Sequence, residues 1–157
     1  MFEHISNKSI RIYFFSKQCM HQKRIEKFDY KCFEKFDGKD FLIPNQIHSN
    51  NVNFSNTPGQ IDNCDGVFTS NPKVVCSIKV ADCMPIFFAH QYLSFYGVVH
   101  AGWKGAFSGI IKNTITEFRK MNSNNQIYAC VGPCIAKRNY EVDLPFYQKF
   151  IKRSGQN

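Results

Sequence analysis

The chain of 157 residues has 43% hydrophobic residues and a formal net charge of +8 at pH 7. This size and composition fit one small domain over residues 1–157, with enough apolar side chains to fill a single core. No apolar run approaches the roughly 20 residues of a membrane-spanning helix, and the N-terminal residues lack the pattern of a signal peptide, so we expect a cytoplasmic protein without a membrane partner. The seven cysteines are irregularly spaced, which favours reduced thiols over disulfides in this setting.

Apolar runs of strand length recur along the chain. They lie at residues 10–15, 40–43, 52–54, 66–69, 74–80, 85–89, 95–100 and 126–131. Helical patterns fall at residues 20–28, at residues 105–121 and from about residue 143 to about residue 152, with Asp143 as the expected N-cap of the last helix. This order predicts an α/β or α+β domain with a mixed β-sheet core and flanking helices.

The positive charge is concentrated in two segments, residues 23–39 and 149–153. Both segments fit the solvated polar face of a helix or a loop, and the chain carries none of the motifs typical of nucleic-acid-binding domains. We therefore expect no nucleic-acid partner. The basic surface would still draw anionic substrates such as phosphate towards a cleft.

Cys83 precedes the apolar run at residues 85–89, and His100 ends the run at residues 95–100. Two neighbouring strands with these runs would bring the thiol and the imidazole together at one end of a sheet. This pair suits two kinds of chemistry, namely zinc coordination or a nucleophile with its general base. The alternative without chemistry is a buried free cysteine beside a core histidine, because free cysteine is among the most buried residue types.

His48 adds a third side chain, since it follows another apolar run on a turn rich in Asn and Ser. Two histidines and one cysteine form a three-ligand set that leaves one tetrahedral position open, as in catalytic zinc sites. Asp82, next to Cys83, is a candidate proton carrier or ligand partner, or else the cap of a turn. Cys130 and Cys134 flank a Gly-Pro turn but have no second pair at metal-site spacing, so we expect no second metal site.

Four motifs follow one another over residues 40–143. They are Asn45-Gln46-Ile47-His48, Ala81-Asp82-Cys83-Met84-Pro85, His100-Ala101-Gly102-Trp103-Lys104-Gly105 and Val131-Gly132-Pro133-Cys134-Ile135. In this order they resemble the YfiH/YlmD family, which is also called the purine nucleoside phosphorylase YfiH family and, in older usage, multicopper polyphenol oxidase or laccase-like. Some bacterial members of that family are described as peptidoglycan-editing factors.

The resemblance implies a layered α/β/β/α fold and places the family's metal ligands on His48, Cys83 and His100. It also implies zinc-dependent chemistry on purine nucleosides: phosphorolysis of adenosine, inosine or methylthioadenosine, with phosphate as a second substrate, and deamination of adenosine. Copper belongs to the older family description, and we expect zinc instead because multicopper oxidation needs more histidines than the five present.

Within the motifs we expect Asp82 to act with Cys83 and His100 in catalysis, and Gln46 and Lys104 to bind the substrate. Bound zinc would lower the pKa of its water towards neutrality and give a hydroxide able to attack C6 of adenine.

Two departures from the family concern the phosphate site. Family members usually carry an arginine where this chain has Gln18, and they are longer at the C-terminus, where further arginines lie. Arginine binds phosphate in a bidentate manner, so its absence weakens the case for phosphorolysis more than the case for deamination. Lys104, which stands where many relatives have arginine, would compensate in part.

Three functions are thus open. The first is a zinc-dependent enzyme acting on purine nucleosides. The second is a metal-free cysteine hydrolase, with Cys83 as nucleophile and His100 as base, acting on an amide such as a cell-wall precursor. The third is a shortened, inactive relative that binds a partner through its basic face. Zinc content that depends on Cys83 separates the first from the second.

Overall fold

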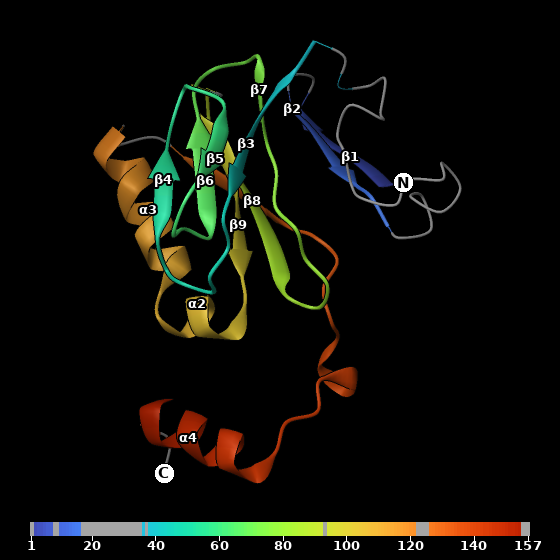
Figure 1. Ribbon diagram of the computed structural model, residues 1–157, viewed down its shortest axis with the longest axis vertical. Helices are drawn as coiled ribbons and strands as arrows, with labels where there is room; N and C mark the ends of the chain where they lie inside the picture. The colour runs from blue at the N-terminus through green and yellow to red at the C-terminus, as the bar shows by residue number, and fades with distance from the viewer. Residues whose placement is uncertain are drawn as a thin grey trace.

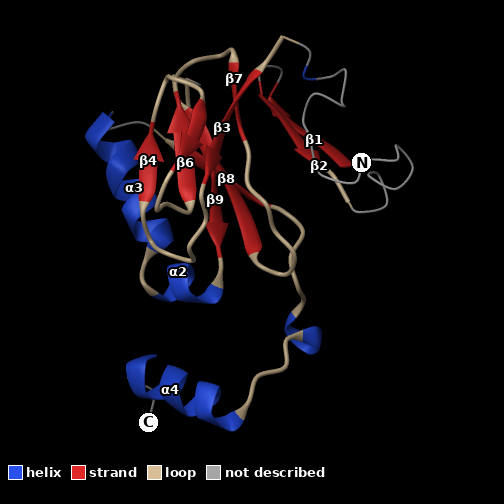
Figure 2. Ribbon diagram, in the orientation of Figure 1, coloured by secondary structure: helices blue, strands red, loops and turns tan. Residues whose placement is uncertain are grey.

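The computed structural model describes residues 2–7, 10–16, 36, 38–92, 94–121 and 126–154 (Figure 1). The helix expected at residues 20–28, together with Gln18, lies outside these residues. Most of the strands lie together, with helices to the left of them and below them in this view, and the N-terminal hairpin lies to the right (Figure 2). Among the described helices, none combines the length and the apolar composition needed to cross a lipid bilayer.

A five-stranded sheet carries the later strands of the chain, in the order β10-β8-β9-β6-β4. Its strands are β4 (Val52–Phe54), β6 (Gly66–Thr69), β8 (Met84–His90), β9 (Tyr96–Ala101) and β10 (Ile127–Val131). β4 pairs with β6 in parallel, whereas the pairs β6–β9, β9–β8 and β8–β10 are antiparallel. The sheet is therefore mixed, as predicted.

A three-stranded parallel sheet places β3 (Asp40–Pro44) between β5 (Gly59–Ile61) and β7 (Val74–Cys76). β1 (Phe2–Asn7) and β2 (Ile10–Phe14) form a separate antiparallel hairpin. The sequence predicted neither β1 nor β5. β5 is short and mostly exposed, so it is defined by its pairing with β3 rather than by an apolar run.

Two apolar cores lie on the two faces of the five-stranded sheet. Phe68, Val99 and Phe118 belong to the core on one face, where the sheet packs against a helix, and Val67 and Val98 belong to the core between the two sheets. Because successive residues of a strand point to opposite faces, strands covered on both faces are apolar throughout, and β6 is buried along its whole length. A mixed α/β fold with flanking helices is thus confirmed, and the described residues contain an α layer and two β layers.

The prediction of one continuous helix over residues 105–121 is wrong, because the structure has two helices there. α2 (Trp103–Phe107) and α3 (Ile110–Met121) are separate, and Gly109 between them has a φ of 92°. That left-handed conformation favours glycine and ends the first helix, although the apolar spacing continues across the break. A 3-10 turn (Lys137–Asn139) precedes α4 (Leu144–Ser154), where the predicted cap is confirmed because the Phe146 N–H donates to Asp143 Oδ1 at 2.8 Å.

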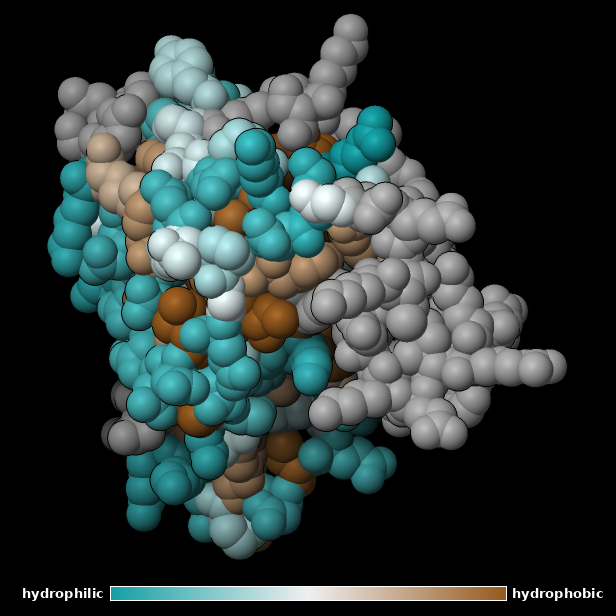
Figure 3. Space-filling model, turned by 45° about the horizontal axis from the view of Figure 1, so that its top comes forward, coloured by the Kyte–Doolittle hydropathy of each residue, from teal (hydrophilic) through white to brown (hydrophobic). Residues whose placement is uncertain are grey.

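The face drawn in Figure 3 is mainly hydrophilic, with apolar side chains in small separate patches. This distribution fits a chain whose larger apolar side chains fill the two cores.

Candidate metal centre

The pairing of β8 with β9 brings Cys83 and His100 together. Pro85 lies opposite His100 in this antiparallel pair, and Met84 lies opposite Ala101. Cys83 immediately precedes β8, so its side chain lies at the end of β9 that carries His100. The neighbouring strands expected from the two apolar runs are therefore present.

His48 reaches the same point from the loop that follows β3. One ligand atom from each of His48, Cys83 and His100 lies within 4.8 Å of the others, and the two imidazole rings meet edge to face with centroids 4.7 Å apart. His48 is exposed, Cys83 is half-buried and His100 is only 4% exposed. The cluster thus opens to solvent on the His48 side and is closed on the His100 side.

Gly102 occupies the space against all three side chains. A Cβ atom at this position would lie 2.9 Å from Cδ2 of His48, 3.2 Å from Sγ of Cys83 and 3.4 Å from Cε1 of His100. Real Cβ atoms almost never come as close as the 2.9 Å to His48, so a larger residue would displace the His48 ring and crowd Sγ of Cys83. A Cβ at Gly105 would collide with the carbonyl oxygen of Ser49, which keeps α2 close to the His48 loop.

Asp65 is the functional candidate that the sequence analysis missed. It is fully buried, and its carboxylate accepts a hydrogen bond from Nδ1 of His100 at 2.8 Å and others from the loop around His48. Burial alone would raise the pKa of Asp65, but the hydrogen bonds from His100, Ser49 and Ile47 hold this pKa below its usual range. The one signal in the sequence was weak, a single carboxylate directly before the strand β6.

Burial raises the pKa of the Cys83 thiol, and the negative charges of Asp82 and Asp65 raise it further. This surrounding disfavours a thiolate, unless a cation offsets the negative charge.

The donors fit a zinc-type ion. Imidazole nitrogen and cysteine sulfur are the ligands that zinc prefers, and three of them leave a position for water or substrate. Since Nδ1 of His100 is engaged by Asp65, Nε2 remains for the ion, in the arrangement common to metal-binding histidines. Gly102 leaves the space between the donors free of a side chain. No other group of three potential ligands occurs among the residues that the structure describes.

The remaining predicted site residues, Gln46, Asp82 and Lys104, each have a different contact. The Gln46 side chain is hydrogen-bonded to the backbone of Lys79. Asp82 is exposed beside Cys83, and its carbonyl oxygen accepts a hydrogen bond from the Ile135 N–H at 3.0 Å. Lys104 is exposed on α2, with Nζ 5.7 Å from the centre of the Trp103 ring.

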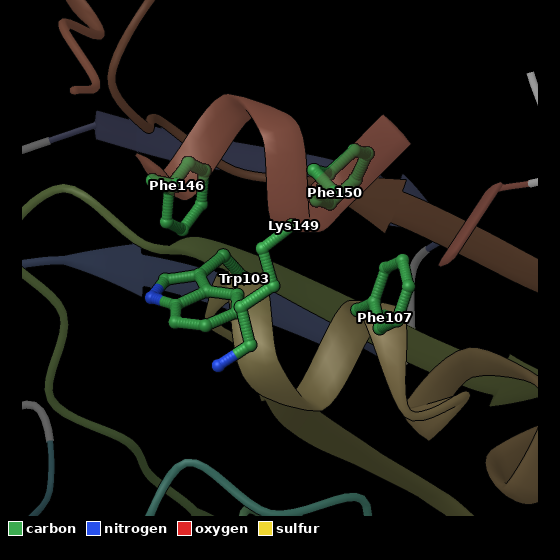
Figure 4. Close-up of a pocket in the computed structure, with 5 residues that line it drawn as sticks. All are labelled: Trp103, Phe107, Phe146, Lys149 and Phe150. Atoms are coloured by element: carbon green, nitrogen blue, oxygen red, sulfur yellow. The ribbon is translucent and has the colours of Figure 1, made fainter. Parts of the chain in front are cut away.

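The last helix lies over α2, close to this site. Phe146 contacts Trp103 with ring centroids 4.8 Å apart, and Phe150 contacts Phe107 at 4.9 Å. Figure 4 shows these rings, together with Lys149, around a small apolar pocket between the two helices. α4 therefore packs on the rest of the molecule through aromatic contacts with α2, the helix that follows His100.

The chain matches the family model described as multi-copper polyphenol oxidoreductase laccase over residues 21–157. It belongs to this family, the YfiH/YlmD family that its motifs resemble. The chain is similar to a purine nucleoside phosphorylase of Rickettsia prowazekii (strain Madrid E), with 37% identity over 123 residues, which cover 78% of this chain and 51% of the relative.

A purine nucleoside phosphorylase of Rickettsia conorii (strain ATCC VR-613 / Malish 7) is 30% identical over 158 residues, which cover 100% of this chain and 65% of that protein. The crystal structure of YlmD from Geobacillus stearothermophilus has a similar fold, with a TM-score of 0.66 at 23% identity over 73% of this chain and 47% of that chain. The chain spans less than two thirds of the length of each of these three proteins.

Proposed function

We propose that this chain carries a zinc-dependent active site that acts on purine nucleosides. The observation that carries the proposal is the convergence of His48, Cys83 and His100 beside Gly102, at a point that is open to solvent on one side. The substrate class is suggested by the names of the two Rickettsia relatives, both purine nucleoside phosphorylases.

Burial and hydrogen bonding assign different tasks to the residues. His100 is buried and its ring is fixed by Asp65, which suits a ligand rather than a mobile acid or base. His48 completes the set at the open side, where a substrate can enter. A bound zinc ion would supply Lewis acidity, which lowers the pKa of a coordinated water towards neutrality. The exposed carboxylate of Asp82, next to Cys83, would accept a proton and return it to the reacting group.

Adenosine deamination is the activity that these residues support best, with phosphorolysis second. Deamination needs water, a proton carrier and a purine pocket, whereas phosphorolysis also needs an anion site. Losing one charge-assisted hydrogen bond costs about 1.5–3 kcal/mol, so a phosphate site without its arginine is slower by one or more orders of magnitude. Lys104, on the helix that follows His100, would supply a charge but not the two parallel hydrogen bonds of arginine.

Elemental analysis combined with product analysis on adenosine, with and without phosphate, tests the proposal. We expect about one zinc ion per chain and inosine as the main product. Cys83→Ser should lose the metal, and Cys134→Ser, which changes an exposed cysteine outside the cluster, should keep it. Phosphate-dependent adenine release that outpaces inosine formation would reverse the order of the two activities. If the zinc-loaded protein showed neither activity, the remaining interpretation would be an inactive relative of the family's enzymes.

A metal-free cysteine hydrolase is the second candidate. Asp65, His100 and Cys83 form a carboxylate–imidazole–thiol series, which is also the arrangement of a cysteine nucleophile with its base and orienting acid. Amide hydrolysis that survives a strong chelator and is abolished by Cys83→Ser would favour this candidate over the zinc enzyme.

A further inference from the structure

Asp65 connects two of the three candidate ligands through one carboxylate. Its Oδ1 accepts hydrogen bonds from the His48 N–H at 3.0 Å and from Nδ1 of His100 at 2.8 Å. Its Oδ2 accepts from the Ile47 N–H at 3.2 Å, the Ser49 N–H at 2.6 Å and the Ser49 hydroxyl at 2.8 Å. All five partners are donors, and the carboxylate is fully buried among them.

The first consequence concerns the backbone of His48. The N–H groups of Ile47, His48 and Ser49 all point at the same anion, which is the geometry of a backbone nest. His48 has a φ of 59°, a left-handed conformation that residues with a side chain rarely adopt. A buried negative charge that gathers three successive N–H groups compensates for this strain and fixes where the His48 side chain leaves the loop.

The second consequence concerns the proton on the His100 ring. Because a carboxylate only accepts hydrogen bonds, Nδ1 of His100 must carry the hydrogen. In the neutral ring Nε2 then keeps its lone pair, the form in which an imidazole binds a metal. The same carboxylate therefore selects the tautomer of one ligand and the backbone conformation of the other.

We propose that Asp65 is a positioning residue that sets His48 and His100 together and thereby prepares the pair for a metal ion. This inference rests on the proposed function only in its reference to the metal. The tautomer of His100 and the conformation of the His48 loop are properties of the metal-free protein.

Asp65→Asn is the decisive substitution because it keeps the shape and removes one acceptor. An amide has a single oxygen, so its NH2 group must face donors on one side. With the oxygen towards Ile47 and Ser49, the NH2 group meets the His48 N–H, which cannot accept, and His100, whose ring can pair with it only by presenting Nδ1 as an acceptor. That change moves the hydrogen to Nε2 and removes the lone pair from the nitrogen that faces the site.

The test combines two measurements on the full chain. Nitrogen-15 NMR of the imidazole groups, assigned with His100→Gln, reads the tautomer of His100 in metal-free protein. Competition with a chelator reads the affinity for Zn²⁺. We expect the Nδ1–H form in the wild type, its loss in Asp65→Asn, and a zinc affinity weaker by about 10- to 100-fold in that variant. Asp62→Asn is the matched control, because it removes the same charge from an exposed neighbour that bonds only Asn45 among its described partners.

An Nε2–H tautomer in the metal-free wild type would overturn the inference, as would wild-type zinc affinity in a folded Asp65→Asn protein. If that variant does not fold, Ser49→Ala, which removes one donor and leaves the carboxylate, must retain the Nδ1–H form for the inference to stand. If the wild type itself binds no zinc, the proposed function fails, while the NMR measurement still decides the role of Asp65.

Discussion

Gln46 and Lys79 hold each other through a reciprocal pair of hydrogen bonds. Nε2 of Gln46 donates to the Lys79 carbonyl at 2.8 Å, and the Lys79 N–H donates to Oε1 of Gln46 at 2.8 Å. The side-chain amide thus pairs with the backbone of Lys79 as a backbone amide would in a β-ladder. It joins the loop that carries His48 to the segment that leads to Cys83. β7 ends at Cys76 rather than at the predicted residue 80, and Lys79, which lies beyond this end, is held by the contact with Gln46.

Gln46→Ala should therefore weaken zinc binding rather than substrate binding. The two lost hydrogen bonds predict a decrease of about 1–3 kcal/mol in the free energy of unfolding and a lower affinity for zinc. Chemical denaturation and chelator competition measure the two effects, with Gln60→Ala, at an exposed position of β5, as the control. A raised KM for adenosine at unchanged zinc affinity and stability would instead support the substrate-binding role expected from the sequence.

Gly102→Ala should expel the metal without unfolding the protein. The added methyl group would displace the His48 ring and crowd Cys83, whereas the backbone of Gly102 is extended, with a φ of −67°, and accommodates alanine. We expect zinc content well below one ion per chain at nearly unchanged melting temperature of the metal-free protein. Ala106→Ser, at an exposed position of the same helix, should bind zinc normally. If Gly102→Ala kept one zinc ion per chain, the ion would have to bind somewhere other than between His48, Cys83 and His100.

Four of the thiols that the structure describes should separate into three classes on alkylation. Cys134 is exposed and should react at once, with or without a chelator. Burial raises the pKa of Cys76 to about 12, and burial and nearby Asp65 raise that of Cys64 to about 11, so both should react only on unfolding. Cys83 should become reactive when a chelator is added. Mass spectrometry of the peptide that contains Cys83 measures its labelling. Equal labelling with and without chelator would favour a buried cysteine that holds no metal.

The only tryptophan of the chain reports on the position of α4. Phe146→Ala removes the ring that contacts Trp103, so we expect a red-shifted emission and stronger quenching by iodide, with little change in the melting temperature of the two-sheet core. Tyr147→Ala changes a side chain of α4 that is 55% exposed and should leave the emission as it is. Identical spectra for both variants would show that α4 does not rest on Trp103 in solution.

Stability should fall at alkaline pH through Tyr96. Burial, with a contribution from the Cys76 thiolate, raises the pKa of Tyr96 to about 12, and its hydroxyl donates to the carbonyls of Asn71 and Val74. The unfolded tyrosine loses its proton near pH 10, so between pH 10 and 12 the unfolded state binds fewer protons and the free energy of unfolding decreases as the pH rises.

Tyr96→Phe should lower stability by about 1–2 kcal/mol at neutral pH and reduce the loss above pH 10. Tyr92→Phe, at a position that is 70% exposed, should do neither. Denaturant titrations from pH 8 to 11.5 distinguish the variants, and an unchanged alkaline slope in Tyr96→Phe would assign the effect to another group.

Periodicity located most of the strands, because alternating or continuous apolar residues leave a direct mark on the sequence. β4 and β6 have the predicted bounds, and β8 and β9 differ by one residue at each end. It could not locate β5, which has a single apolar side chain, Ile61, and is defined mainly by its pairing with β3. Nor could it separate α2 from α3, since apolar spacing carries across the two residues that break the helix.

The convergence of Cys83 and His100 was predictable because both residues flank apolar runs that pair in an antiparallel sheet. Asp65 was not, because a single aspartate before a strand is indistinguishable from a turn residue until the donors around it are known. The contact between Gln46 and Lys79 was not predictable for the same reason, since the partner of Gln46 is a backbone amide in another segment. Their roles depend on partners distant in sequence.

The Asp65–His100 hydrogen bond spans 35 residues of sequence and forms only when β9 is seated between β6 and β8. A partly unfolded chain lacks this bond and the paired histidines with it, so on the proposed function zinc would bind the folded form alone. By mass action, each tenfold excess of free zinc over its Kd would then add about 1.4 kcal/mol to the stability. Cells short of zinc would accumulate less of the protein, because proteases remove unfolded chains, and its abundance would follow the supply of the metal.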